Sequence, residues 1–127
     1  MLRTILIVED ADTAATTLEV ALLGIPGVQV ERVRDGLRAL EYLAPGGGRV
    51  VEALVTDLEL PFLDGFELIA RLRGEPRFAK LPIVVVSGHS DPQAEDRARR
   101  LGASAYFSKP WSPVEVQQTV ARFLNSS

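Results

Sequence analysis

The stretch Ile5-Leu6-Ile7-Val8-Glu9-Asp10 is a short apolar run that ends directly in two carboxylates. Short runs that are apolar on both faces are typical of buried parallel strands. Three further segments have the same form, a strand-like run followed by a residue that can handle a phosphoryl group: Ala53-Leu54-Val55-Thr56 before Asp57, Ile83-Val84-Val85-Val86 before Ser87, and Tyr106-Phe107 before Lys109-Pro110. Because the carboxyl ends of parallel strands meet at one edge of a sheet, where ligands of open α/β sheets bind, we expect these polar groups to share one site.

Length and composition restrict the possible functions. The 127 residues fit one ordinary domain, and the hydrophobic (46%) and charged (24%) fractions are those of a globular protein. A net charge of -3 and a pI near 5.2 indicate no basic surface for nucleic acid or an anionic membrane. The chain has no cysteine, and no apolar run approaches the roughly 18 residues of a membrane span. We expect a single cytoplasmic domain over residues 1–127, without direct nucleic-acid binding or membrane insertion.

The alternation of strand and helix patterns predicts the fold class. Five strands are predicted: Ile5–Val8, Val28–Val33, Ala53–Thr56, Pro82–Ser87 and Ala105–Ser108. Apolar residues at helical spacing predict a helix after each strand, with these stripes: Ala14, Leu18, Ala21 and Leu22; Ala39, Leu40 and Leu43; Leu68, Ile69 and Leu72; Ala94, Ala98 and Leu101; Val116, Val120, Phe123 and Leu124. Ser112 before Pro113 is a typical helix start. The pattern predicts a three-layer α/β domain with a parallel sheet.

One glycine-rich stretch has the composition of a phosphate-binding loop but not its spacing. Pro45-Gly46-Gly47-Gly48 follows a helix and has no Lys-Ser/Thr pair after it. We interpret it as a flexible connection.

The clustered carboxylates indicate a metal ion. Glu9, Asp10 and Asp57 at one edge would repel one another and raise each other's pKa unless a positive charge lay among them. Magnesium prefers hard oxygen ligands and typically uses one or two carboxylates together with water and phosphate oxygens. A carboxylate can also attack phosphorus, and such a transfer needs mainly positioning and charge neutralisation. These residues therefore predict a Mg²⁺-assisted phosphoryl-accepting site.

Over nearly its whole length the chain resembles a known family. The motifs are Val8-Glu9-Asp10, Asp35-Gly36 with Ala39-Leu40, Thr56-Asp57 with Pro61-Phe62-Leu63-Asp64-Gly65, Val86-Ser87-Gly88, and Gly102-Ala103-Ser104-Ala105-Tyr106 before Lys109-Pro110. In this order and spacing they closely resemble the receiver domain of bacterial two-component response regulators, of the kind found in chemotaxis. The resemblance implies a flavodoxin-like (βα)5 fold with sheet order 2-1-3-4-5.

The resemblance also implies a role for each residue of the site. Asp57 would accept the phosphoryl group from a phosphohistidine on a sensor histidine kinase or histidine phosphotransfer protein. Asp10 would bind Mg²⁺ directly and Glu9 through water, with Asp57 and the backbone carbonyl of Glu59 as further ligands. Ser87 and Lys109 would contact the phosphoryl oxygens.

Further implications concern the response to phosphorylation. Tyr106 would turn inward as Ser87 moves, changing the face to which an unknown downstream protein binds. Glu59 and His89 would tune the lifetime of the phosphorylated state, and the Lys109–Pro110 bond would be cis. Such a domain catalyses its own phosphorylation and dephosphorylation and is a switch, not a turnover enzyme.

Taken singly, these residues allow simpler interpretations. Asp10 or Asp12 could cap the first helix, and His89 could be a residue at the solvent edge. An aspartyl-phosphate hydrolase of the haloacid dehalogenase type is disfavoured, because Glu59 stands where that class carries a second aspartate. The alternative that stays open is a receiver-like module that binds partners without phosphorylation.

Overall fold

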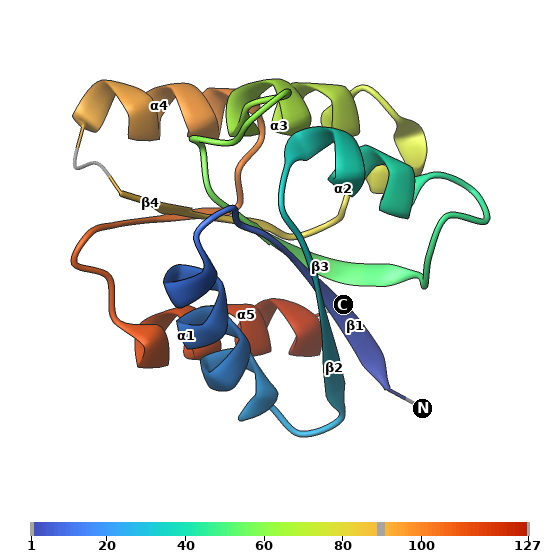
Figure 1. Ribbon diagram of the computed structural model, residues 1–127, viewed down its shortest axis with the longest axis vertical. Coiled ribbons are helices and arrows are strands. Elements are labelled where there is room, and N and C mark those ends of the chain that lie inside the picture. Colours follow the sequence, from blue (N-terminus) through green and yellow to red (C-terminus); the bar gives the residue numbers. More distant parts are fainter. Residues whose placement is uncertain (1, 89–90, 127) are drawn as a thin grey trace.

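The computed structural model describes residues 2–88 and 91–126 of the chain (Figure 1). Five parallel strands form one sheet in the order β2-β1-β3-β4-β5, as predicted. The strands are β1 (Arg3–Val8), β2 (Val28–Val33), β3 (Val51–Thr56), β4 (Ile83–Ser87) and β5 (Ala105–Ser108). The helices are α1 (Asp12–Leu23), α2 (Gly36–Leu43), α3 (Gly65–Arg73), α4 (Pro92–Leu101) and α5 (Pro113–Asn125), with a 3₁₀ turn η1 (Pro76–Phe78).

The sheet is covered on both faces, which confirms the predicted three layers. Figure 1 shows α1 and α5 on one face and α2, α3 and α4 on the other. Alternate residues of β1 serve the two cores: Ile5 and Ile7 pack on the α1 and α5 side, whereas Leu6 and Val8 pack on the α3 side. Every core position of β1 is fully buried, which is why this strand is a continuous apolar run. No helix built from the described residues has the length and hydropathy of a membrane span.

The boundaries differ from the predicted ones in a few places. β1 and β3 each begin two residues earlier, at Arg3 and Val51, and β4 begins at Ile83. Pro82 has no N–H to donate, although its carbonyl accepts from Leu54 at 2.9 Å. The simpler interpretation of Asp10 or Asp12 as the cap of α1 does not hold. The N-cap is Ala11, whose side chain cannot accept a hydrogen bond.

The strand register brings the predicted site residues to one edge. Val8 lies opposite Thr56, and the Asp57 N–H donates to the Val8 carbonyl at 3.1 Å, so Glu9 and Asp57 leave neighbouring strands at the same level. Ser87 lies opposite Ser108, and the Lys109 N–H donates to the Ser87 carbonyl at 3.0 Å. The carboxyl edge of the sheet therefore gathers all four strand ends.

Two glycines allow backbone segments to approach this edge closely. A Cβ at Gly65 would lie 2.3 Å from the Asp57 carbonyl oxygen, and one at Gly36 would lie 2.3 Å from that of Leu63. Both glycines begin helices, and the aspartate before each one accepts a backbone N–H as an N-cap. α2 and α3 are thus seated directly on the loop that follows Asp57.

Candidate functional site

The Asp57 carboxylate lies at the end of β3 and is oriented by the backbone that follows it. Its Oδ1 accepts the N–H of Leu58 at 2.7 Å and that of Glu59 at 3.4 Å, and the Asp57 carbonyl accepts the Thr56 hydroxyl at 2.8 Å. The residue is half-buried. The acceptor carboxylate predicted from the sequence is therefore held by short-range contacts rather than free to rotate in solvent.

Glu9 is the buried acid of the site. Its relative exposure is 6%, and its Oε2 accepts the Ala11 N–H at 3.1 Å. Burial raises the pKa of this carboxyl, and the negative charge of Asp57 raises the pKa further, against the lowering effect of the Ala11 hydrogen bond. Glu9 and Asp57 follow paired positions of neighbouring strands, which is why the charge of one acts on the other.

Asp10 lies on the solvent side of Glu9 and borders an open depression of about 1040 Å³ at the carboxyl edge. Glu59 and Ser87 border the same depression, so the structure brings them together with Asp10. Ser87 is buried, with 2% exposure, whereas Lys109 is exposed beyond the end of β5. The Lys109–Pro110 bond is cis, the isomer that the family resemblance implies.

The donor chemistry of this edge fits magnesium. Within residues 2–88 and 91–126, no three acidic or imidazole side chains are close enough to form a metal centre by themselves. Magnesium does not require that, because it usually keeps several waters and takes one or two carboxylates. A buried Glu9 whose pKa is raised beside Asp57 is the electrostatic situation that a divalent cation relieves. Asp10 and Asp57 would supply direct oxygen ligands, Glu9 a water-mediated one, and Glu59 a backbone carbonyl.

Tyr106 occupies an inward position. It is 8% exposed and belongs to the core cluster that contains Ala98 of α4. Its hydroxyl is buried and has no hydrogen-bond partner among the described residues. His89, the other residue predicted to influence the site, lies outside the described residues.

The loop between β3 and α3 carries a strained residue that sequence analysis did not single out. Phe62 has φ of 67° and is 81% exposed, while the Leu63 N–H donates to the Pro61 carbonyl at 2.7 Å across it. Positive φ is rare for a bulky residue, and strained backbone of this kind is concentrated at functional sites. Nothing in the residue type of Phe62 could have signalled it.

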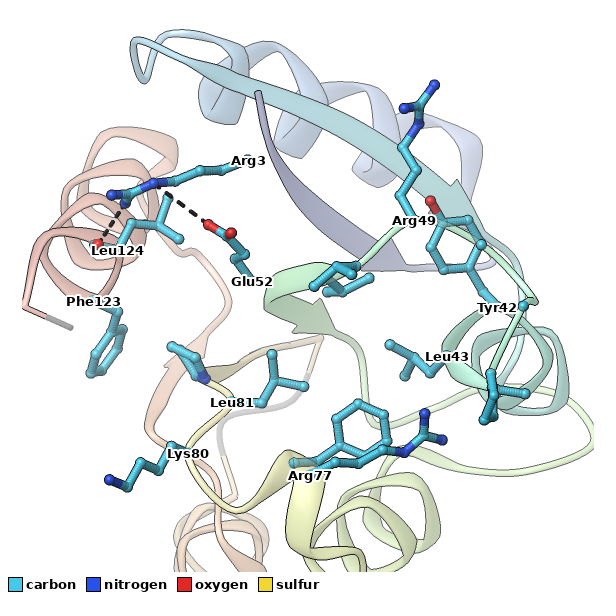
Figure 2. Close-up of a pocket in the computed structure, with 18 of the residues that line it drawn as sticks. Arg3, Tyr42, Leu43, Arg49, Glu52, Arg77, Lys80, Leu81, Phe123 and Leu124 are labelled. Atoms are coloured by element: carbon cyan, nitrogen blue, oxygen red, sulfur yellow. Dashed lines mark hydrogen bonds and ion pairs between the residues drawn. The ribbon is translucent and has the colours of Figure 1, made fainter. Parts of the chain in front are cut away.

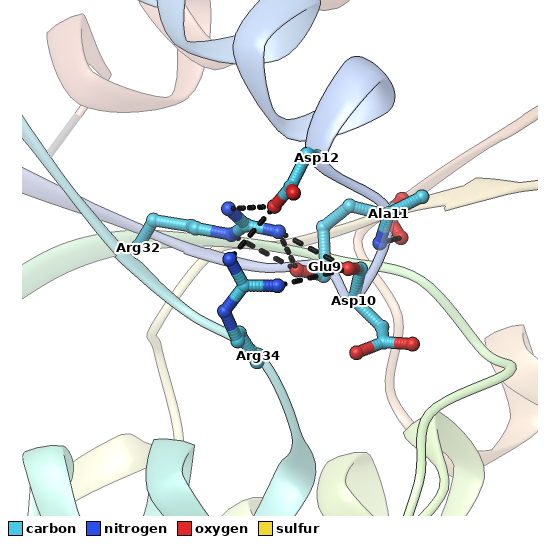
Figure 3. Close-up of polar contacts among 6 residues, drawn as sticks. All are labelled: Glu9, Asp10, Ala11, Asp12, Arg32 and Arg34. Carbon is cyan, nitrogen blue, oxygen red and sulfur yellow. Dashed lines mark hydrogen bonds and ion pairs between the residues drawn. The ribbon is translucent and has the colours of Figure 1, made fainter.

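Arg32 and Arg34 of the β2 end were also missed (Figure 3). Both guanidinium groups donate to Asp12 Oδ1 at 2.8 Å and to backbone carbonyls of the loop that bears Glu9 and Asp10. The hydrogen bonds from Arg32 and Arg34 lower the pKa of Asp12. Two arginines at i and i+2 at the end of a strand were a usable signal, but only once β2 was known to lie beside β1.

A second depression, of about 870 Å³, lies at the opposite, amino edge of the sheet (Figure 2). Figure 2 shows Leu43 and Leu81 near its centre, with Arg49, Arg77 and Lys80 around it. The glycine-rich stretch that superficially suggests a phosphate loop borders this depression and is remote from Asp57 in the sheet. It connects α2 to β3, in agreement with its interpretation as a connection.

An open parallel sheet in the order 2-1-3-4-5, with acidic, hydroxyl and amine groups at its carboxyl edge, is the architecture of flavodoxin-like α/β domains. Comparison with known proteins identifies the family within that class. The sequence profile of the response regulator receiver domain matches residues 5–121, so the chain belongs to that family.

Two of the similar curated proteins are chemotaxis proteins of Helicobacter pylori. The chain is 34% identical to the chemotaxis protein CheV1 of Helicobacter pylori (strain ATCC 700392 / 26695) over 94% of its own length and 37% of that protein. Across the first three relatives it spans only 14 to 37% of their length.

Solved structures give the same result. A crystal structure of a protein from Chloroflexus aurantiacus J-10-fl, assigned as a response regulator, has a TM-score of 0.88 and 35% identity, with 98% of each chain covered. The receiver domain of the sensor histidine kinase PA1611 from Pseudomonas aeruginosa PAO1 has a TM-score of 0.85 and 25% identity, covering 99% of this chain and 100% of that one. That receiver domain was solved with a magnesium ion coordinated in its active site cleft.

Proposed function

We propose that this chain, over residues 1–127, is a single phosphoacceptor receiver domain that takes a phosphoryl group onto Asp57 and switches conformation. The observation that carries the proposal is the strand register that brings Asp57 beside Glu9 and places Ser87 and Lys109 at the same edge. The phosphodonor is a phosphohistidine of a sensor histidine kinase or histidine phosphotransfer protein. The proposed location is the cytoplasm, and no direct contact with nucleic acid is part of the function.

The reaction is a transfer between two nucleophiles. An oxygen of the Asp57 carboxylate forms a bond to phosphorus while the phosphorus–nitrogen bond of the donor breaks, and the imidazole nitrogen takes up a proton. The N–H groups of Leu58 and Glu59 hold the carboxylate in place during the attack. Mg²⁺ bound at Asp10, Asp57 and the Glu59 carbonyl would neutralise charge on the phosphoryl oxygens. The Lys109 ammonium and the Ser87 hydroxyl would contact the same oxygens.

Hydrolysis of the phosphorylated Asp57 would end the active state. Water attacks phosphorus, the bond to the Asp57 oxygen breaks, and inorganic phosphate leaves. Glu59 is exposed on the rim of the depression, where its side chain can border the approach of that water. We propose that Glu59 and His89 tune this rate. The domain thus acts on itself and has no external substrate to turn over.

The output of the switch depends on the surface formed by α4, β5 and α5. Phosphorylation would shift an existing equilibrium between two conformations, with Ser87 and Tyr106 changing together. A downstream protein would bind the face around Tyr106 differently in the two states. This chain matches only part of the length of several relatives. Its kinase and its target are set by surfaces that the shared site residues do not specify.

Intact mass spectrometry after incubation with acetyl phosphate and Mg²⁺ tests the proposal. The parent chain is expected to gain the mass of one phosphoryl group, and Asp57→Asn to gain none. Asp64→Asn is the matched control, because this N-cap aspartate lies on the same loop and is expected to leave labelling intact. An unlabelled parent chain, under conditions that label another receiver domain, would instead favour a module that binds partners without phosphorylation.

A further inference from the structure

The loop that carries the predicted metal ligands is fastened from outside by two arginines of the β2 end (Figure 3). Arg32 donates twice to the Glu9 carbonyl, from Nε at 3.0 Å and from Nη2 at 2.9 Å. Its Nη2 also donates to the Asp10 carbonyl at 3.2 Å, and its Nη1 to Asp12 Oδ1 at 2.8 Å. Arg34 repeats two of these contacts, to the Asp10 carbonyl at 3.4 Å and to Asp12 Oδ1 at 2.8 Å.

The sheet explains why both arginines reach the same loop. Arg32 lies opposite Ile7 in the β1–β2 register, and Ile7 packs on the α1 side of the sheet. Side chains two residues apart share a face, so Arg34 leaves on that side as well. β2 is the edge strand next to β1, which places its carboxyl end against the start of α1. The Arg32 side chain is 21% exposed, and its two contacts with the Glu9 carbonyl are partly buried, whereas those with Asp10 and Asp12 lie at the surface.

These contacts hold the start of α1, which has no side-chain cap. The N-cap residue, Ala11, offers no side-chain acceptor, and Asp12 in the first turn is engaged by the arginines. The two arginines therefore fix the turn from Glu9 to Asp12 through its carbonyl oxygens and one carboxylate. A planar guanidinium suits this role, because its fork can bind two acceptors at set angles.

Fixing the carbonyls also directs the metal-binding side chains. Figure 3 shows the Asp10 carboxylate pointing away from both guanidinium groups, while the Asp10 carbonyl faces them. Asp10 borders the depression shared with Glu59 and Ser87. Holding the Asp10 carbonyl fixes the peptide plane from which this side chain leaves toward the depression.

We propose that Arg32 and Arg34 are positioning residues that preorganise the Glu9–Asp10 turn for Mg²⁺ and so set the affinity of the metal site. The proposal rests on the proposed function, which supplies the metal. For the change in Mg²⁺ affinity on removal of an arginine, it predicts the opposite sign to a simple charge effect. Two cations near a metal site repel Mg²⁺, so charge alone predicts tighter binding when an arginine is removed. Preorganisation predicts weaker binding.

Calorimetric titration with MgCl₂ separates these two effects. Arg32→Met keeps much of the length of the side chain but loses its donors, and we expect about tenfold weaker Mg²⁺ binding, as for other residues that orient metal ligands. Arg32→Lys keeps the positive charge but loses the planar guanidinium, and we expect a similar loss of Mg²⁺ affinity. Arg71→Met is the control for net charge, because this exposed arginine pairs with Glu67 on α3, and the Mg²⁺ affinity of the variant should match the parent's. Unchanged or tighter binding by a folded Arg32→Met would overturn the proposal.

A second readout uses the metal-free protein. Hydrogen exchange of the segment 8–13 should be about tenfold faster or more in Arg32→Met, because hydrogen bonds from a charged donor are lost. Exchange equal to the parent's would also overturn the proposal. If Arg32→Met fails to fold, Arg34→Met, whose side chain is 57% exposed, serves with a roughly threefold loss of Mg²⁺ affinity expected. A parent chain that binds no Mg²⁺ would contradict the proposed function itself, whereas a binding parent with unaffected variants would contradict only the role of the arginines.

Discussion

The carboxyl and amino edges of the sheet differ in backbone strain and in buried charge, two features that lower the stability of a folded protein. At the carboxyl edge a buried carboxylate, Glu9, faces Asp57, Phe62 holds a left-handed backbone, and Gly65 brings helix and loop into contact. At the amino edge an apolar depression is surrounded by arginine and lysine side chains, and Glu52 pairs with Arg3 at 3.5 Å near the surface. Strain and buried charge are thus concentrated where the chemistry is proposed, which is where proteins tolerate them.

The largest expected effect comes from closing the space at Gly65. In Gly65→Ala the added Cβ would meet the Asp57 carbonyl oxygen at 2.3 Å and the Leu58 Cα at 2.7 Å, and both are backbone atoms that cannot rotate away. We expect a loss of about 3 kcal/mol in the free energy of unfolding, at the upper end for overpacking, together with reduced labelling by acetyl phosphate. Urea denaturation measures the first effect and mass spectrometry the second.

The matched control lies at the other end of the same helix. Gly74 caps α3 at the amino edge and has ordinary helical dihedral angles, and a Cβ added there would come no closer than 3.4 Å to a neighbouring atom. Gly74→Ala should be neutral or gain up to about 0.5 kcal/mol, because alanine restricts the unfolded chain. Equal losses in the two variants would contradict the view that the close contact between Gly65 and the loop after Asp57 makes its substitution costly.

The second prediction concerns the buried acid. Glu9→Gln removes a charge that burial and Asp57 disfavour, while the amide oxygen can still accept the Ala11 N–H. In metal-free buffer at pH 7 we expect a gain of about 1 kcal/mol in the free energy of unfolding, the usual size of one favourable substitution. Mg²⁺ binding should weaken at the same time. Glu52→Gln at the amino edge should change stability little, because its partner Arg3 is exposed.

The pH dependence of the Glu9→Gln difference has a defined sign. The pKa of Glu9 is raised in the folded state above its ordinary value of 4.5, so the protonated carboxyl contributes fully to the parent's stability below pH 4.5, and this contribution is lost as the pH rises through the raised pKa. The advantage of Glu9→Gln should therefore be absent at low pH and should grow toward neutrality. Thermal unfolding of both proteins in EDTA across this range measures it. An advantage that grew as the pH fell would show that Glu9 is not the group responsible.

The fold was predictable because β1, β3 and β4 are apolar on both faces, a pattern that signals buried parallel strands. The sheet order needed the family resemblance, since nothing in the strand composition tells which strand neighbours β1. Arg32 was missed although the resemblance places β2 beside β1, because it acts largely on backbone carbonyls, which no residue type marks. Asp57 and Ser87 could be named because they come directly after apolar runs, whereas the strain at Phe62 comes from the path of the loop and leaves no mark on the residue type.

The smallest expected change in stability concerns Phe62, and it distinguishes relief of backbone strain from removal of an exposed apolar side chain. Phe62 at the carboxyl edge and Val50 at the amino edge are 81% and 83% exposed, but among the described residues only Phe62 is a non-glycine residue with positive φ. Phe62→Asn should gain about 0.5 kcal/mol, because asparagine adopts the left-handed region more readily and little buried surface is lost. Val50→Asn should gain nothing, since its backbone has no such strain to relieve. Chemical denaturation of both variants beside the parent measures the difference, and an equal gain in both would mean that removing exposed apolar surface, and not relief of the turn at Phe62, accounts for the stabilisation.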